Sequence, residues 1–276
     1  PEDPMTIAKK VYVCLSLGLP MSLLLLAACR QVEKISPEDR SPPSDSVAST
    51  FSKAIETDRG FSSAGNRVSQ SRNVQNFDRI RCSFGELIVT QGDRESLTIT
   101  AEDRILSQIV SEVRDGTLYL YPENNTPFVT FDRVQFELTV KNLDELNLDG
   151  VVRVQAENLE TDRLQLQATG SAEIAINSLK ANTLNVDLGG ASKLNLAGKV
   201  IDQTLRFSGG SQYRAELLES QNIDLEIDGA GEATVWANDR LDVQINGTGN
   251  VGFYGTPDVR QDIRGVGSIQ PLGGSR

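Results

Sequence analysis

The chain has 276 residues and no histidine, and its 38 Asp plus Glu outnumber its 27 Lys plus Arg to give a formal net charge of −11. This acidity excludes nucleic acid as an electrostatic partner and disfavours adsorption to anionic lipid, because there is no surplus of basic residues. The absence of histidine excludes Ser-His-Asp and Cys-His catalysis, and no cysteine is spaced for a zinc site, so we expect no metal and no cofactor.

Residues 1–29 have the pattern of a lipoprotein signal peptide. Two lysines precede an apolar stretch, residues 11–26, which is short and is broken by a glycine and a proline, as in a secretory signal rather than a membrane-spanning helix. Its end, "LAAC", resembles the lipobox of bacterial lipoproteins. That resemblance implies cleavage before Cys29, lipidation of Cys29 and attachment to a membrane. Because Arg30 rather than Asp follows, the resemblance favours the outer membrane.

The mature chain would then keep one free thiol, since Cys14 leaves with the signal and Cys29 carries the lipid. No basic residue or helix start near Cys82 would activate it, so we expect a buried strand residue. Residues 30–75 are rich in Ser, Pro and charged residues and have too few apolar residues to fold. We expect a disordered polar tether that reaches roughly 35–40 Å.

From Phe77 onward, "ELIVT", "SLTITA", "TLYLY" and "VQFELTV" alternate between apolar and polar residues, which predicts strands. Between them, "AEDRILSQIVSEVRDG" places Ile105, Ile109 and Val113 at four-residue intervals. This spacing predicts a short amphipathic helix that ends at Asp115–Gly116. The first part of the folded domain is therefore expected to be strand-rich, with one short helix.

The strongest signal is a repeat whose glycines are spaced by 18 to 20 residues. Apolar residues stand two positions before each glycine and four and six positions after it, which predicts a parallel β-solenoid of about seven coils of about 20 residues. The glycines are Gly150, Gly170, Gly190, Gly209, Gly229, Gly247 and Gly265.

Outward positions of successive coils carry opposite charges, which supports the same register. One row reads Arg153, Glu173, Lys193, and another reads Asp187, Arg206, Glu226. We expect each repeat glycine to form a corner with positive φ. Calcium or nucleotide binding by these glycines is disfavoured, because the period is about twenty residues and no helix follows a glycine-rich turn.

The stretch "FDRIRCSFGELIVTQGDRESLTITAEDRILSQIVSEVRDGTLYL" and the serial "DG", "TGSA", "GGAS", "GAG" and "GTG" turns resemble the auto-transporter adhesin head, or GIN-domain, family. The resemblance covers residues 76–272, which we take as the folded domain. It implies an adhesin-type module, and it brings no catalytic residues with it.

A binding or adhesion module displayed on the cell envelope is therefore the expected function, with an extracellular glycan or an envelope protein as partner. Trp236 and Tyr254 stand seven residues after their glycines and are predicted to face outward on adjacent coils, where sugar rings could stack on them. The alternative role of this pair, which we favour, is to cover the C-terminal end of the solenoid or to meet another part of the chain. A structural or signalling component of the envelope is a further alternative.

A polysaccharide-processing enzyme is the remaining alternative, with Asp187, Glu226, Asp228 and Glu232 as candidate carboxylates. We expect no catalysis, because these rows alternate in charge and no long loop walls a cleft. We also expect a monomer, because the ending "QPLGGSR" places Pro271 and two glycines where a terminal strand would otherwise pair.

Overall fold

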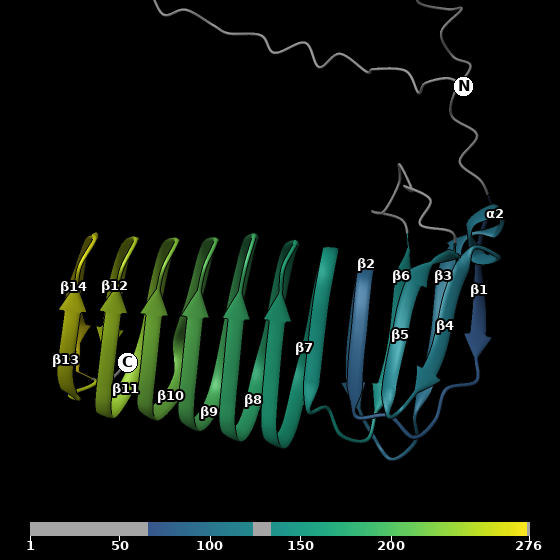
Figure 1. Ribbon diagram of the computed structural model, residues 1–276. Helices are drawn as coiled ribbons and strands as arrows, with labels where there is room; N and C mark the ends of the chain where they lie inside the picture. Colours follow the sequence, from purple (N-terminus) through teal and green to yellow (C-terminus); the bar gives the residue numbers. More distant parts are fainter. Residues whose placement is uncertain (1–65, 124–133, 275–276) are drawn as a thin grey trace, which may run out of the picture. The chain divides into compact units, whose positions relative to one another are not determined.

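The computed structural model describes residues 66–123 and 134–274 (Figure 1). The chain divides into two units, residues 1–62 and 63–276, and the described residues all belong to the second. The predicted signal peptide, the lipidation site at Cys29 and the tether up to residue 65 lie outside the described residues. Among the described residues, no helix has the length and apolar character needed to cross a membrane.

The predicted parallel β-solenoid is confirmed, with about six turns. Each strand bends at a corner and pairs in parallel with the equivalent stretch of the next turn, so that Leu188 lies opposite Phe207, as the repeat predicts. The solenoid strands are β7 (Glu145–Ala168), β8 (Ser171–Leu188), β9 (Ala191–Phe207), β10 (Gly210–Ile227), β11 (Ala230–Ile245), β12 (Thr248–Tyr254), β13 (Asp258–Ile263) and β14 (Val266–Gly273).

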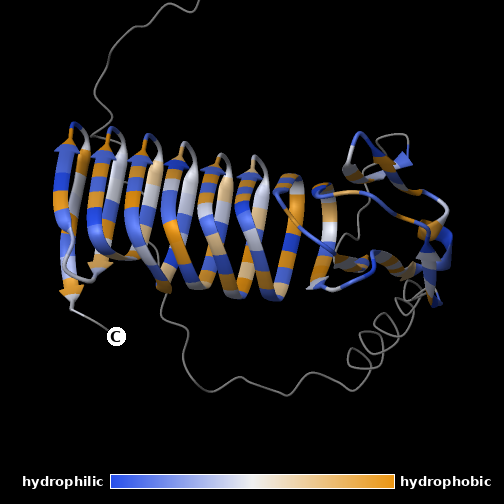
Figure 2. Cartoon of the chain, turned by 90° about the horizontal axis from the view of Figure 1, so that it is seen from below, coloured by the Kyte–Doolittle hydropathy of each residue, from blue (hydrophilic) through white to orange (hydrophobic). Residues whose placement is uncertain are grey.

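Inward side chains of successive turns stack into apolar columns that fill the solenoid. Leu188, Phe207, Ile227 and Ile245 form one such column, and each is at most 1% exposed. Figure 2 shows the alternation as orange and blue bands along the strands. Burying each large apolar side chain contributes about 1.5–3 kcal/mol, so the columns supply most of the favourable free energy of the fold.

The predicted rows of opposite charge are found on the outer surface. Arg153 Nε lies 3.1 Å from Glu173 Oε2, and Arg206 Nε lies 3.7 Å from Glu226 Oε2, in each case across neighbouring turns. These side chains are well exposed, so each pair stabilises by only about 0.2–1 kcal/mol. Their main effect is on register, because a slip of one residue would separate every pair.

The parallel ladder ends in an antiparallel cap at the N-terminal side of the solenoid. Strand β2 pairs in parallel with β7 on one edge and with β5 and β6 on the other. Strand β4 then adds antiparallel to β5, β3 to β6, and β1 to β3 (Figure 1). The cap elements are β1 (Arg67–Arg72), β2 (Arg79–Gln91), β3 (Ser96–Glu102), α2 (Asp103–Leu106), β4 (Ile109–Arg114), β5 (Thr117–Pro122) and β6 (Gln135–Val140).

Two predictions about the cap need correction. The helix α2 has a single turn, and the rest of the predicted helix is β4, which forms a hairpin with β5. The hairpin turn is Asp115–Gly116, whose φ angles of 48° and 75° are those of a tight strand-to-strand connection. The fold also begins earlier than residue 76, because β1 lies within the predicted tether and Val74 is 3% exposed.

The repeat glycines are required for a different reason from the one predicted. Only Gly190 has a positive φ, 74°; the other six do not. In all seven, an added Cβ would lie within 3.0 Å of a backbone carbonyl oxygen of the turn below. That oxygen is held in place by the next turn, as where Gly210 N donates to Gly190 O at 2.8 Å. The glycines therefore form a ladder in which backbone stacks on backbone.

The thiol of Cys82 is fully buried on β2, where Sγ donates to Phe84 O at 3.2 Å. Burial raises its pKa to about 12. A raised thiol pKa leaves the neutral form dominant, so the thiolate fraction at pH 8 falls roughly a thousand-fold below that of an unfolded cysteine. We expect Cys82 to resist alkylation by iodoacetamide at pH 8 and to react after denaturation, as measured by peptide mapping. Labelling of Cys82 in the native chain at the denatured rate would contradict this burial.

Candidate functional site

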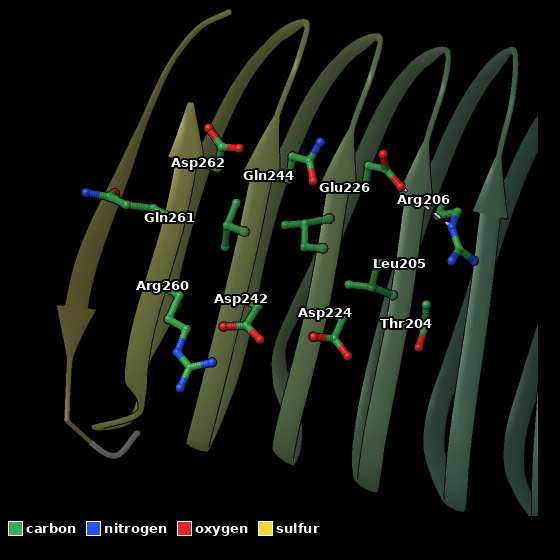
Figure 3. A pocket seen from close by; sticks show the side chains of 12 residues that line it. Thr204, Leu205, Arg206, Asp224, Glu226, Asp242, Gln244, Arg260, Gln261 and Asp262 are labelled. Atoms are coloured by element: carbon green, nitrogen blue, oxygen red, sulfur yellow. Dashed lines mark ion pairs between the residues drawn. The ribbon is translucent and has the colours of Figure 1, made fainter. Parts of the chain in front are cut away.

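A shallow groove of about 380 Å³ lies on the outer surface of the solenoid, across four neighbouring strands. Two columns of outward side chains border it, one beginning at Thr204 and the other at Arg206 (Figure 3). The columns are Thr204, Asp224, Asp242 and Arg260, and Arg206, Glu226, Gln244 and Asp262, from β9, β10, β11 and β13.

Strand alternation builds this groove directly. Leu205, Leu225 and Val243 point into the core at 0–3% exposure, so the residues on either side of each must point outward. Because neighbouring parallel strands lie about 4.8 Å apart, each column repeats a polar group at that interval. The groove therefore offers carboxylate and amide acceptors together with guanidinium donors along one line, which suits an extended ligand rich in hydroxyl groups.

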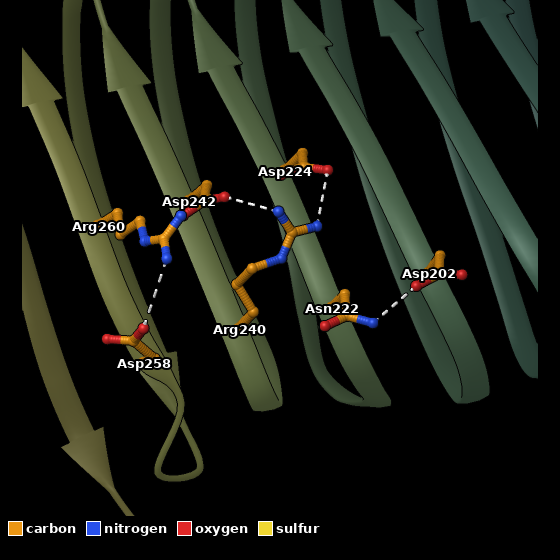
Figure 4. Close-up of polar contacts among 7 residues, drawn as sticks. All are labelled: Asp202, Asn222, Asp224, Arg240, Asp242, Asp258 and Arg260. Carbon is orange, nitrogen blue, oxygen red and sulfur yellow. Dashed lines mark hydrogen bonds and ion pairs between the residues drawn. The ribbon is translucent and has the colours of Figure 1, made fainter.

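Arg240 sets the charge at one border of the groove. It donates to Asp224 Oδ2 at 3.3 Å and to Asp242 Oδ2 at 2.8 Å, and so bridges two neighbouring turns (Figure 4). The second oxygen of Asp242, Oδ1, is buried and has no hydrogen-bond partner among the described residues. Arg260 lies 4.0 Å from Asp258 and is 70% exposed. The guanidinium of Arg260 is thus a donor in the groove that the fold itself does not use fully.

Trp236 and Tyr254 lie opposite each other on β11 and β12, as the repeat places them. Both are half-buried, and Trp236 Nε1 donates to Asn238 Oδ1 at 3.1 Å. Both residues stand seven positions after their repeat glycines, at the end of the strand segment that follows the glycine corner. The groove lies on the strand segment that precedes this corner. The structure therefore does not bring the aromatic pair into the groove.

Three of the four carboxylates considered for catalysis make contacts between turns. Asp228 Oδ1 accepts from Asn246 at 2.7 Å, and Glu232 Oε2 accepts from Gln212 at 3.0 Å. Asp187 lies opposite Arg206, and the ion pair of Arg206 is with Glu226 on the following turn. Across residues 66–123 and 134–274, no three carboxylate or thiol groups are placed to hold a metal ion. The contacts of Glu226, Asp228 and Glu232 join neighbouring turns of the stack.

The family match covers residues 76–257, with the description "Putative auto-transporter adhesin, head GIN domain". This chain belongs to the GIN-domain family. No curated protein is a match for it. The family membership confirms the resemblance seen in the opening residues of the domain and in its serial glycine turns.

Solved structures share the fold of this GIN-domain chain. A protein from Bacteroides fragilis that is described as an adhesin is 26% identical, with a TM-score of 0.71 over 75% of this chain and 97% of the other. A protein described as lipid-binding from Parabacteroides distasonis is 20% identical, with a TM-score of 0.62 over 76% and 98%. A protein from Parabacteroides merdae that is described as an adhesin is 17% identical, with a TM-score of 0.59 over 76% of this chain and 97% of the other. The last two likenesses concern the fold alone.

The groove was not among the sites that the sequence predicted, although part of its signal was present. Arg206 and Glu226 of the predicted row Asp187, Arg206, Glu226 lie on one border of the groove, and the same repeat, read two residues earlier, gives Thr204 and Asp224 on the other. The bridging role of Arg240 had no such signal, because its partners depend on side-chain conformation rather than on register.

Proposed function

We propose that this chain is an envelope-anchored lipoprotein whose β-solenoid binds an extended polar ligand, a cell-surface polysaccharide, through the outer groove. The observation that carries the proposal is the pair of polar columns that run across four turns, with hydrogen-bonding groups about 4.8 Å apart. A solenoid holds such a line rigid, so little ordering entropy opposes binding of a long ligand.

Family membership and the Bacteroides fragilis relative support an adhesion-type role, because both are described as adhesins. The engagement of three of the four candidate carboxylates in contacts between turns supports binding without catalysis. The lipobox-like ending at Cys29 supports an anchor in a membrane, and Arg30 supports the outer membrane. An envelope glycan or envelope protein is the partner that such a location provides.

A matched pair of double variants tests the groove on an array of bacterial polysaccharides. Glu226→Ala with Gln244→Ala removes an acid and an amide from neighbouring turns of the groove. Glu232→Ala with Asn250→Ala removes the same two chemical groups from neighbouring turns outside it. We expect the first pair to weaken binding roughly tenfold or more, since each lost hydrogen bond contributes about 0.5–1.5 kcal/mol, and the second to leave it unchanged.

Two other variants separate the alternatives. Trp236→Ala is expected to leave binding unchanged, and a loss confined to this variant would move the ligand to the aromatic pair. Equal binding by all the variants would contradict the groove proposal. Shortening of a bound polysaccharide by the wild type, abolished by Asp228→Asn, would instead favour the enzymatic alternative.

A further inference from the structure

The last turn of the solenoid is open in a way that the interior turns are not. Among the described residues, β13 pairs only with β11 and β14 pairs only with β12, so each has one unpaired edge (Figure 1). Ile263 continues the inward column of Ile245, yet it is 38% exposed where Ile245 is fully buried. An edge with unpaired backbone and exposed apolar side chains favours addition of another strand.

Among the described residues, the charged side chains of β13 and its following corner make no ion pair with another turn. Inside the solenoid, pairs such as Lys199–Glu219 and Arg206–Glu226 join neighbouring turns, and Arg240 pairs both within its own strand and with the neighbouring turn. At the edge, ion pairs join residues two apart on the same segment: Asp258 with Arg260 at 4.0 Å and Asp262 with Arg264 at 2.6 Å. All four side chains are at least half exposed, so they are available to a strand that adds at this edge.

The sequence of β13 and its corner is complementary to a second, antiparallel copy of itself. If a second β13 lies antiparallel with Gln261 opposite Gln261, Asp258 faces Arg264 and Arg260 faces Asp262 on the outer side. On the inner side, Val259 then faces Ile263. Opposite charges and paired apolar residues at directly facing positions both stabilise antiparallel strands.

We propose that the C-terminal edge of the solenoid binds a second copy of this chain, through antiparallel pairing of β13 about Gln261. The contact is two-fold symmetric and closed, because each copy supplies the same strand. It extends the sheet that already joins the turns, and it covers Ile263. This dimer replaces the monomer expected from Pro271, because that proline lies on β14 and removes no N–H from the free edge of β13.

The N-terminal end presents two outermost strands, β1 and β4. Strand β1 reads RVSQSR and has Val68 as its single apolar residue, so it cannot match both Val259 and Ile263. Strand β4 reads IVSEVR, and its two charged residues, Glu112 and Arg114, already pair with each other, so it does not match the four charges of β13 and its corner. A two-fold contact between C-terminal edges also brings the two grooves together, since Arg260, Gln261 and Asp262 line the groove. The inference does not rest on the proposed function, since it concerns the edge alone.

Disulfide trapping in membranes of expressing cells tests the contact with the full chain. Directly facing residues of antiparallel strands have Cα atoms about 4.5–5.5 Å apart, within the range that a disulfide spans. We expect Gln261→Cys to give a covalent dimer on a non-reducing gel after mild oxidation. Asn195→Cys, exposed in the middle of the solenoid, is the matched control and should stay monomeric. No dimer from Gln261→Cys, or equal amounts from both variants, would overturn the proposal.

Charge reversal provides a second, independent measurement in the Gln261→Cys chain. Arg260→Glu places two like-charged pairs across the symmetric contact, so we expect the trapped fraction to fall roughly tenfold. Adding Asp262→Arg restores opposite charges at the same positions and should restore trapping. Because Arg260 is exposed, the single change should not unfold the chain. A trapped fraction that ignores Arg260→Glu, or that the second change fails to restore, would contradict the register.

Discussion

Gly209→Ala is expected to destabilise the solenoid by about 3 kcal/mol or more, whereas Gly210→Ala should change stability by less than about 1 kcal/mol. A Cβ on Gly209 would overlap the carbonyl oxygen of Gly190 in the turn below. That oxygen cannot move away, because it accepts the N–H of Gly210 at 2.8 Å. The overlap would therefore have to separate two turns of the stack. A Cβ on Gly210 would meet nothing within 4 Å.

These two variants are a matched pair, because the residues are adjacent and the chemical change is the same. Urea denaturation followed by circular dichroism would measure the difference as a shift in midpoint. Midpoints for both variants equal to that of the wild type would show that the glycine ladder is not required. A similar loss of stability in both variants would point instead to a general need for flexibility at this corner, which the stacking argument does not predict.

The repeat made the inward columns predictable from the sequence. Leu188 and Phe207 could be paired in advance because both stand two residues before a glycine, and strand alternation then fixes which way they point. The charged rows followed from the same register. Features that recur with the period of the repeat can thus be predicted from the sequence, since every turn repeats the evidence for them.

Features that depend on contacts between non-equivalent segments could not be predicted from the sequence. Ile109 and Val113 fit a helical face, but pairing with β5 across the Asp115–Gly116 turn places them in a strand. Strand β1 is polar enough to resemble a tether, and it forms because β3 offers it a hydrogen-bonding edge. The groove likewise needed the turns to be stacked before its two columns could be seen to lie together.

Cys29→Ser is expected to abolish incorporation of a labelled fatty acid into the chain completely, whereas Cys14→Ser should leave it unchanged. Both cysteines lie near the apolar stretch of residues 11–26, but only Cys29 follows the "LAA" that resembles a lipobox. Metabolic labelling with an alkyne fatty acid, read on a gel, measures the difference. Label that persists in Cys29→Ser, or that is lost in Cys14→Ser, would contradict lipidation at this position.

The size of this effect follows from how such a chain would be held at the membrane. The net charge of −11 disfavours binding to an anionic lipid surface, so the proposed lipoprotein would be attached by its acyl chains, at about 0.8 kcal/mol for each buried methylene. A serine in place of Cys29 would remove the sulfur atom that we propose to carry a lipid. The mature chain of the wild type should accordingly begin at Cys29, which mass spectrometry of the N-terminal peptide would establish, and a mature chain that begins elsewhere would place the anchor in doubt.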